Sequence, residues 1–104
     1  DQMAGSMSGG EQQMLALARA VATEPRVLMI DELSMGLAPQ LVESLFESVR
    51  HLAASGLAVL VIEQFAKAAL SIADRAIVMT SGRIVHSGSP LEVEQHLSSA
   101  YLGA

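Results

Sequence analysis

Two acidic residues that directly follow a short apolar run are the first residues with the types and spacing to do chemistry. The apolar run VLMI at residues 27–30 is followed by Asp31 and Glu32. A continuous run of this kind is typical of a buried strand, so both carboxylates are expected at the end of one. One carboxylate could hold Mg²⁺ through its water shell and the other could orient an attacking water, which suits phosphoryl transfer. The alternative is that the two acids merely end a strand and face solvent.

A second group of residues stands before a helix-forming stretch. Ser8, Gly9 and Gly10 are followed directly by the residues EQQMLALARA. The first turn of a helix offers unpaired N–H groups and the positive end of the helix dipole, and glycines let the backbone approach a phosphate closely. The pattern therefore indicates an anion site, with the Ser8 hydroxyl as a further donor. The alternative is that Ser8 is simply an N-cap and the glycines belong to a loop.

Apolar periodicity predicts the elements that must position these residues. The predicted elements are helices at 9–23, from 39 to the glycine at 56, around 66–73 and at 90–97, strands within 26–32 and 57–64, and a hairpin at 75–88. The two strands consist of continuous apolar runs, so both faces of each are expected to be covered, as in parallel sheets. The order predicts an α/β fold with an open, mostly parallel sheet, a C-terminal β-hairpin and flanking helices. Such sheets place functional groups at the carboxyl ends of their strands, where Asp31, Glu32 and Gln64 are expected.

Composition excludes several classes of protein. The chain has 104 residues and is expected to form a single domain over residues 1–104. It has no cysteine, which excludes disulfides and thiol nucleophiles and fits a reducing, intracellular setting. A net charge of −5 argues against a nucleic-acid partner, and no apolar run approaches the roughly 20 residues of a membrane-spanning helix. The three histidines have no ligand spacing, so ordinary surface histidines are favoured over metal ligands.

Four segments, taken in order and spacing, resemble the motifs of one family. They are SGGEQQMLALARA, PRVLMIDE, LSMGLAP and VLVIEQ. They resemble the signature motif, Walker B strand, D-loop and switch-loop strand of the ATP-binding-cassette (ABC) ATPases, which have a P-loop NTPase fold, over essentially the whole chain. The variants GLAPQLVE and VIEQ, together with the ending GRIVHSGSP…AYLGA, are most similar to the ATPase subunits of branched-chain amino-acid importers.

The resemblance implies a nucleotide-binding role for the start of the first helix. Ser8, Gly9 and Gly10 would contact the γ-phosphate of an ATP held mainly by an opposing subunit, with Glu11 beside them in the same site. ATP and Mg²⁺ would be the cofactors of the complete ATPase. A second ATPase subunit and a membrane permease would be its partners, and its place would be cytoplasmic, peripheral to the inner membrane.

The resemblance also implies roles for the residues at the strand ends. Asp31 would act on the Mg²⁺ shell, and Glu32 would be the catalytic base. Gln64 stands where the family usually has its switch histidine, and it cannot titrate as histidine does. Residues 34–38 would be the D-loop at the dimer interface.

Departures from the family's pattern add further expectations. Leu33 replaces a common proline, which frees a backbone N–H and is expected to loosen the loop, and Ala38 replaces a frequent aspartate. No G-x-x-x-x-G-K-[ST] motif occurs in the sequence, so nothing is expected to cradle the α- and β-phosphates. The chain is therefore expected to correspond to the C-terminal half of an ABC nucleotide-binding domain. Its uncovered strands are expected to drive self-association into a homo-oligomer.

Two functions remain open. In the first, the chain is the C-terminal part of the ATP-hydrolysing subunit of an importer of branched-chain or related amino acids, inactive alone because positioning groups are missing. In the second, it is a non-catalytic module from a truncated gene that associates with itself or with an intact ATPase. An ABC-type ATPase acting on DNA would need a basic face or a coiled-coil insertion, and neither is visible.

Overall fold

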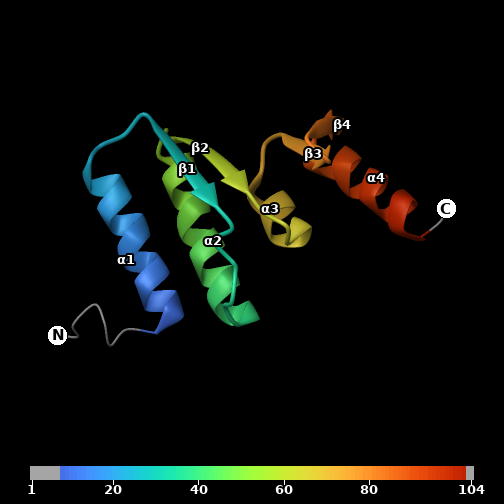
Figure 1. Ribbon diagram of the computed structural model, residues 1–104. Helices are drawn as coiled ribbons and strands as arrows, with labels where there is room; N and C mark the ends of the chain where they lie inside the picture. The colour runs from blue at the N-terminus through green and yellow to red at the C-terminus, as the bar shows by residue number, and fades with distance from the viewer. Residues whose placement is uncertain (1–7, 103–104) are drawn as a thin grey trace. The chain divides into compact units, whose positions relative to one another are not determined.

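The structure, a computed structural model, describes residues 8–102 and has the predicted order of elements (Figure 1). The chain divides into two compact units, Asp1–Ala69 and Leu70–Ala104. The division falls within α3 (Ala66–Ile72), a short helix at the predicted place. No helix of the described part is long and apolar enough to cross a membrane. The expectation of one domain over residues 1–104 stays a prediction.

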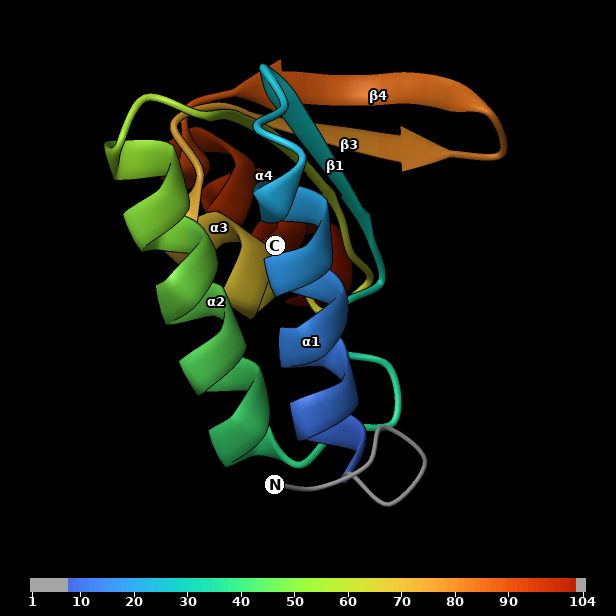
Figure 2. The same ribbon diagram turned by 90° about the vertical axis from the view of Figure 1, so that its left-hand side faces the viewer.

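The first unit combines two helices with a parallel pair of strands. Its elements are α1 (Gly9–Ala22), β1 (Val27–Asp31), α2 (Pro39–Ala54) and β2 (Ala58–Ile62). The two strands pair in parallel, with Met29 opposite Leu60 and Asp31 opposite Ile62. Both ribbon views show α1 and α2 running side by side (Figures 1 and 2). The predicted parallel sheet is confirmed.

Local sequence signals account for the ends of both long helices. α1 begins at the N-cap Ser8 and ends before Glu24, which stands before Pro25 and whose φ of 54° lies outside the right-handed helical region that a residue before proline avoids. α2 begins with Pro39 at its first turn, where a missing N–H has no consequence. It ends before Gly56, whose φ of 108° favours glycine. On the surface of α2, a hydrogen bond from the Arg50 guanidinium lowers the pKa of Glu47.

The core of the first unit covers one face of its sheet and not the other. Its buried apolar side chains come from both helices, from β1 and from the loop after β1: Leu17, Leu28, Ile30, Leu33, Val42, Leu45, Phe46 and Val49. Four apolar residues of the strands alternate with the inward-facing ones and are exposed over half or more of their surface: Val27, Met29, Leu60 and Ile62. The apolar runs predicted cover on both faces, and that does not hold here, because the helices of this unit supply side chains to one face. The further expectation that strands of this chain stay uncovered is confirmed for the other face.

The second unit is a hairpin with a helix packed on it. β3 (Ala76–Thr80) and β4 (Arg83–Gly88) pair antiparallel, and α4 (Pro90–Leu102) packs against both strands. The turn residues Ser81 and Gly82 have φ values of 51° and 76°, as a two-residue type I′ turn requires, so the predicted hairpin is confirmed. Val93 is buried on α4. α4 extends beyond the predicted end at residue 97, and residues 103 and 104 of the predicted tail lie outside the described residues.

Two of the three histidines differ from the surface histidines that were predicted. His86 on β4 and His96 on α4 stack with ring centroids 4.3 Å apart, and the Nε2 atom of His86 is buried without a hydrogen-bond partner. They join helix to hairpin within the second unit. His51 is exposed on α2, with its Nε2 atom 3.3 Å from a carboxylate oxygen of Glu47, and agrees with the prediction.

Candidate functional site

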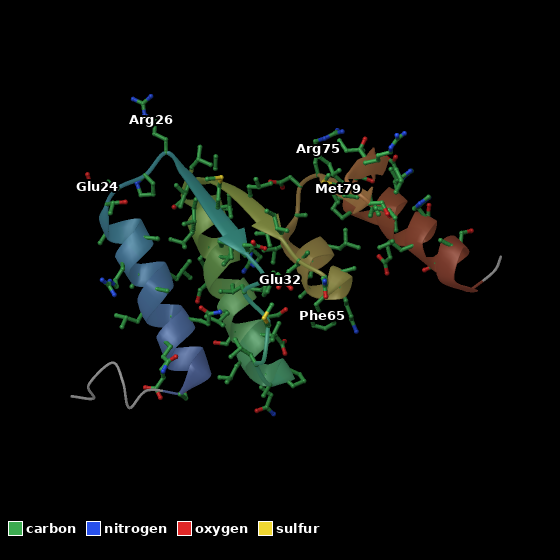
Figure 3. All side chains as sticks on the ribbon, viewed as in Figure 1. Glu24, Arg26, Glu32, Phe65, Arg75 and Met79 are labelled. Carbon is green, nitrogen blue, oxygen red and sulfur yellow. The ribbon has the colours of Figure 1, made fainter. Side chains whose placement is uncertain are left out.

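The carboxyl ends of β1 and β2 bring three of the predicted site residues to one edge of the sheet. Asp31 lies opposite Ile62, and the Glu32 N–H donates to the Ile62 carbonyl oxygen at 2.7 Å. Gln64 follows Ile62 by two residues, so Glu32 and Gln64 leave the sheet at the same edge. Figure 3 shows Glu32 there, with Phe65 of the neighbouring segment also labelled. Asp31 and Gln64 are exposed, and Glu32 is half-buried.

Glu32 has a backbone conformation that is costly for its residue type. Its φ is 52°, in the left-handed region that disfavours residues with a Cβ atom. Such a conformation persists only where neighbouring contacts hold it, and it is frequent at functional sites. The N–H bond to Ile62 is one such contact. The arrangement thus fixes the direction in which the Glu32 side chain leaves the backbone.

The loop after Glu32 is fastened to α1. Leu33 is only 5% exposed, and its carbonyl oxygen accepts a hydrogen bond at 3.3 Å from the side-chain amide of Gln13. Leu33 was expected to loosen this loop because it replaces a proline. That expectation is wrong, because the buried leucine side chain and the carbonyl bond hold the loop in place.

Glu63 ties the same loop to β2, and its role was missed by the sequence analysis. Its Oε2 atom accepts from the Ser34 N–H at 3.1 Å, and its Oε1 atom accepts from the Ser34 hydroxyl at 2.5 Å. Both residues are half-buried. The pair is 29 residues apart in sequence. The one available signal was that Glu63 directly precedes Gln64 at the end of an apolar strand.

The start of α1 forms a capping box. The Ser8 hydroxyl oxygen accepts from the Glu11 N–H at 3.2 Å, and the Glu11 carboxylate accepts from the Ser8 hydroxyl at 3.1 Å. The N-cap interpretation of Ser8 is therefore confirmed, and its contact with a phosphate stays a prediction. The alternative that the glycines belong to a loop is wrong, because Gly9 and Gly10 are the first two residues of α1. The Glu11 carboxylate now lies where an anion would bind. A phosphate here requires the Glu11 side chain to turn away, which frees the Ser8 hydroxyl.

The two glycines of this turn fit closely against the segment that follows β1. A Cβ atom on Gly9 would lie 3.1 Å from Cδ2 of Leu37, and one on Gly10 would lie 3.0 Å from Cδ1 of Leu41. Both distances are shorter than ordinary van der Waals contact. The glycines thus have a packing reason in addition to the predicted phosphate one.

The predicted site residues form two groups in the structure. The start of α1 lies beside residues 37 and 41, apart from the carboxyl ends of the strands (Figure 1). Among residues 8–102 no cluster of three or more histidine or acidic side chains could hold a metal ion. One exposed carboxylate, that of Asp31, fits Mg²⁺ that is held through waters and phosphate oxygens rather than by a protein cage. The donors at the start of α1 fit a phosphate.

Comparison with known proteins finds one family and several similar proteins within it. Residues 1–34 match the family described as ABC transporter. The chain is 47% identical over 105 residues to the high-affinity branched-chain amino acid transport ATP-binding protein BraG of Pseudomonas aeruginosa, a match that covers 99% of this chain and 45% of BraG. It is 39% identical over 94 residues to the probable branched-chain amino acid transport ATP-binding protein LivF of Archaeoglobus fulgidus, over 89% of this chain and 40% of LivF.

A solved structure agrees in fold as well as in sequence. An ATP-binding cassette of an ABC transporter, in its ADP conformation, superposes with a TM-score of 0.87 at 33% identity, over 100% of this chain and 43% of that one. The chain spans less than half the length of each of these relatives. The fold and the relatives agree: the chain belongs to the ATP-binding proteins of the ABC transporter family, and among them it resembles those of branched-chain amino-acid importers.

Proposed function

We propose that the chain provides the C-terminal part of the ATP-hydrolysing subunit of an importer for branched-chain or related amino acids. The observation that carries the proposal is the common edge at which Glu32 and Gln64 leave two paired strands. A base and a polar partner at one strand edge can orient a water for attack on a phosphate. The relatives BraG and LivF, named for branched-chain amino acid transport, support this choice of cargo.

The residues at the strand ends serve one half of a site that is shared between two subunits. Glu32 accepts a proton from the attacking water. Gln64, whose side chain stays neutral, donates a hydrogen bond beside Glu32. Asp31 would hold a Mg²⁺ ion through the waters of that ion, which would neutralise phosphate charge.

The start of α1 serves the second half of the site. Ser8, Gly9 and Gly10 donate to the γ-phosphate of an ATP bound chiefly by the other subunit, once Glu11 turns out of the capping box. The partners are thus a second ATPase subunit and a membrane permease, at the cytoplasmic side of the inner membrane.

The 104 residues alone are inactive under this proposal. They contain no G-x-x-x-x-G-K-[ST] loop, and phosphoryl transfer depends mainly on positioning and on charge stabilisation around the phosphates. The second candidate function, a non-catalytic module that associates with itself or with an intact ATPase, is favoured by the exposed apolar face of β1 and β2.

A chimera tests the proposal. Residues 1–104 replace the aligned region of BraG, which supplies the rest of a cassette, and Mg²⁺-dependent ATP hydrolysis is measured. We expect hydrolysis that Glu32→Gln reduces by roughly a hundredfold or more, and none above background for the 104-residue chain alone. Glu43→Gln, an exposed change on α2, is the matched control and should leave the rate unchanged. Hydrolysis that survives Glu32→Gln would contradict the assignment of the base, and an inactive but folded chimera would favour the non-catalytic module.

A further inference from the structure

We propose that Glu63 is a positioning residue, which fixes residues 33–38 against the strand end that carries Gln64. Its importance for hydrolysis rests on the proposed function, whereas its structural role does not. Glu63 touches neither the helix start nor Asp31 in the contacts described above. It acts through Ser34, two residues after Glu32.

The contacts of Glu63 are those of a clamp with two points. One carboxylate oxygen takes the Ser34 N–H at 3.1 Å and the other takes the Ser34 hydroxyl at 2.5 Å. Both bonds are charge-assisted and half-buried, which makes them stronger than bonds between neutral groups at the surface. Because Glu63 and Gln64 are adjacent, we expect a displacement of residue 34 to alter the position of Gln64.

The clamp also explains how Glu32 keeps its left-handed backbone. On one side its N–H is bonded to the Ile62 carbonyl oxygen, and on the other side Ser34 is held by Glu63. The two bonds hold the chain on both sides of Leu33 and favour the φ of 52° at Glu32. Gln13, bonded to the Leu33 carbonyl oxygen, holds the same loop from α1.

A carboxylate is the side chain that this clamp requires. Ser34 presents two donors, its N–H and its hydroxyl, and a carboxylate offers two acceptor oxygens. A glutamine of the same length offers one acceptor oxygen for the Ser34 N–H, and its NH₂ group can only donate to the Ser34 hydroxyl oxygen, so the hydroxyl bond must reverse and neither bond keeps a charged acceptor. Glu63→Gln is therefore a test that changes volume little and removes the charge from both bonds.

The structural test is amide hydrogen exchange by NMR on the 104-residue chain. We expect the Ser34 amide to exchange roughly tenfold faster in Glu63→Gln, because its hydrogen bond to a charged acceptor becomes a weaker bond to a neutral one. In Ser34→Ala, which removes only the hydroxyl, the Gln64 amide resonance should shift, and in Ser34→Thr, which retains both donors, it should stay in place. Unchanged protection of Val49 on α2 reports that each variant is folded, and Glu43→Gln is the control. Unchanged exchange of Ser34 in Glu63→Gln, or an unmoved Gln64 resonance in Ser34→Ala, would overturn the proposal.

The kinetic test uses the chimera with BraG. Glu63→Gln should lower kcat by roughly tenfold to a hundredfold through misplacement of Glu32 and Gln64, with the KM for ATP within about twofold. An unchanged kcat would show that the clamp has no part in hydrolysis. If the unmodified chimera hydrolyses no ATP, the proposed function fails, and the exchange of the Ser34 amide still decides the positioning role.

Discussion

Gly10 combines the low helix propensity of glycine with a close approach to the Leu41 side chain. Within a helix, replacing glycine by alanine ordinarily gains up to about 1 kcal/mol of stability. At Gly10 the added Cβ atom would lie 3.0 Å and 3.1 Å from the two methyl carbons of Leu41. We expect Gly10→Ala to lower the free energy of unfolding by about 1 kcal/mol, because the isobutyl group of Leu41 must shift. Urea unfolding of the 104-residue chain measures the change.

A double mutant separates packing from any phosphate role of this glycine. In a Leu41→Ala background the obstacle is absent, so Gly10→Ala should there be neutral or stabilising. A loss of stability of the same size in both backgrounds would contradict the packing argument. The comparison needs no nucleotide, and it therefore reports on the packing of α1 against α2 alone.

Single residues show best which parts of the site a sequence can predict. The Ser-Gly-Gly pattern predicted a helix start with donors, and the capping box of Ser8 and Glu11 confirms the helix start. The same pattern gave no hint of Leu41, because that contact joins positions 31 residues apart. Glu63 was missed for the same reason. Its partner Ser34 follows β1, whereas Glu63 follows β2, and only the parallel pairing of these strands brings the two residues together.

α2 begins without a side-chain cap, which gives a prediction at the level of the element. Ala38 occupies the N-cap with φ −65° and ψ 148°, the extended conformation of a capping residue, but the alanine side chain has no oxygen to accept the free N–H groups of the first turn. Ala38→Asp and Ala38→Ser should each raise the free energy of unfolding by about 1 kcal/mol. Thermal or urea unfolding measures the gain.

The opposite end of the same helix supplies the control. Ala54→Asp places the same charge in the last turn of α2, where the negative end of the helix dipole repels it. We expect that variant to lose stability by a few tenths of a kcal/mol to about 1 kcal/mol. Equal gains at both ends would show that the stabilisation comes from charge in general and not from the cap.

Elements whose signals are local were predicted correctly, and properties that depend on distant parts were not. Proline at the start of α2, the left-handed residues of the hairpin turn and the helical spacing of apolar residues all act within a few positions. The burial of a strand depends on what packs over each face. Met29 is 74% exposed in a run that predicted burial on both faces. The apolar run is consistent with a covered strand, and no helix of its own unit contributes to that face.

At the scale of the whole molecule, the first unit exposes an apolar face of its sheet, and the chain spans less than half the length of its relatives. The chain corresponds to 45% of BraG, and its own two-stranded sheet leaves Val27, Met29, Leu60 and Ile62 uncovered. Each strand of this described pair also has one edge without a partner strand. Uncovered apolar faces and free edges favour association with another surface of the same kind.

We therefore predict that the 104-residue chain forms a homo-oligomer in which two such sheet faces meet. Met29 and Leu60 lie opposite each other at the centre of the face, so Met29→Lys and Leu60→Lys should each place a charge in the contact and shift the chain toward monomer. Leu91→Lys is the matched control, because Leu91 is an exposed leucine that belongs to α4 and not to β1 or β2. It should leave the oligomer intact.

Light scattering coupled to size exclusion at micromolar concentration measures the mass of each variant. A monomeric unmodified chain would refute the prediction, and an oligomer that Leu91→Lys disrupts as strongly as Met29→Lys would place the contact elsewhere. Since burial of an apolar face contributes about 25 cal/mol per Å² before the cost of association, the fit of these two faces decides between a stable dimer and a weak one.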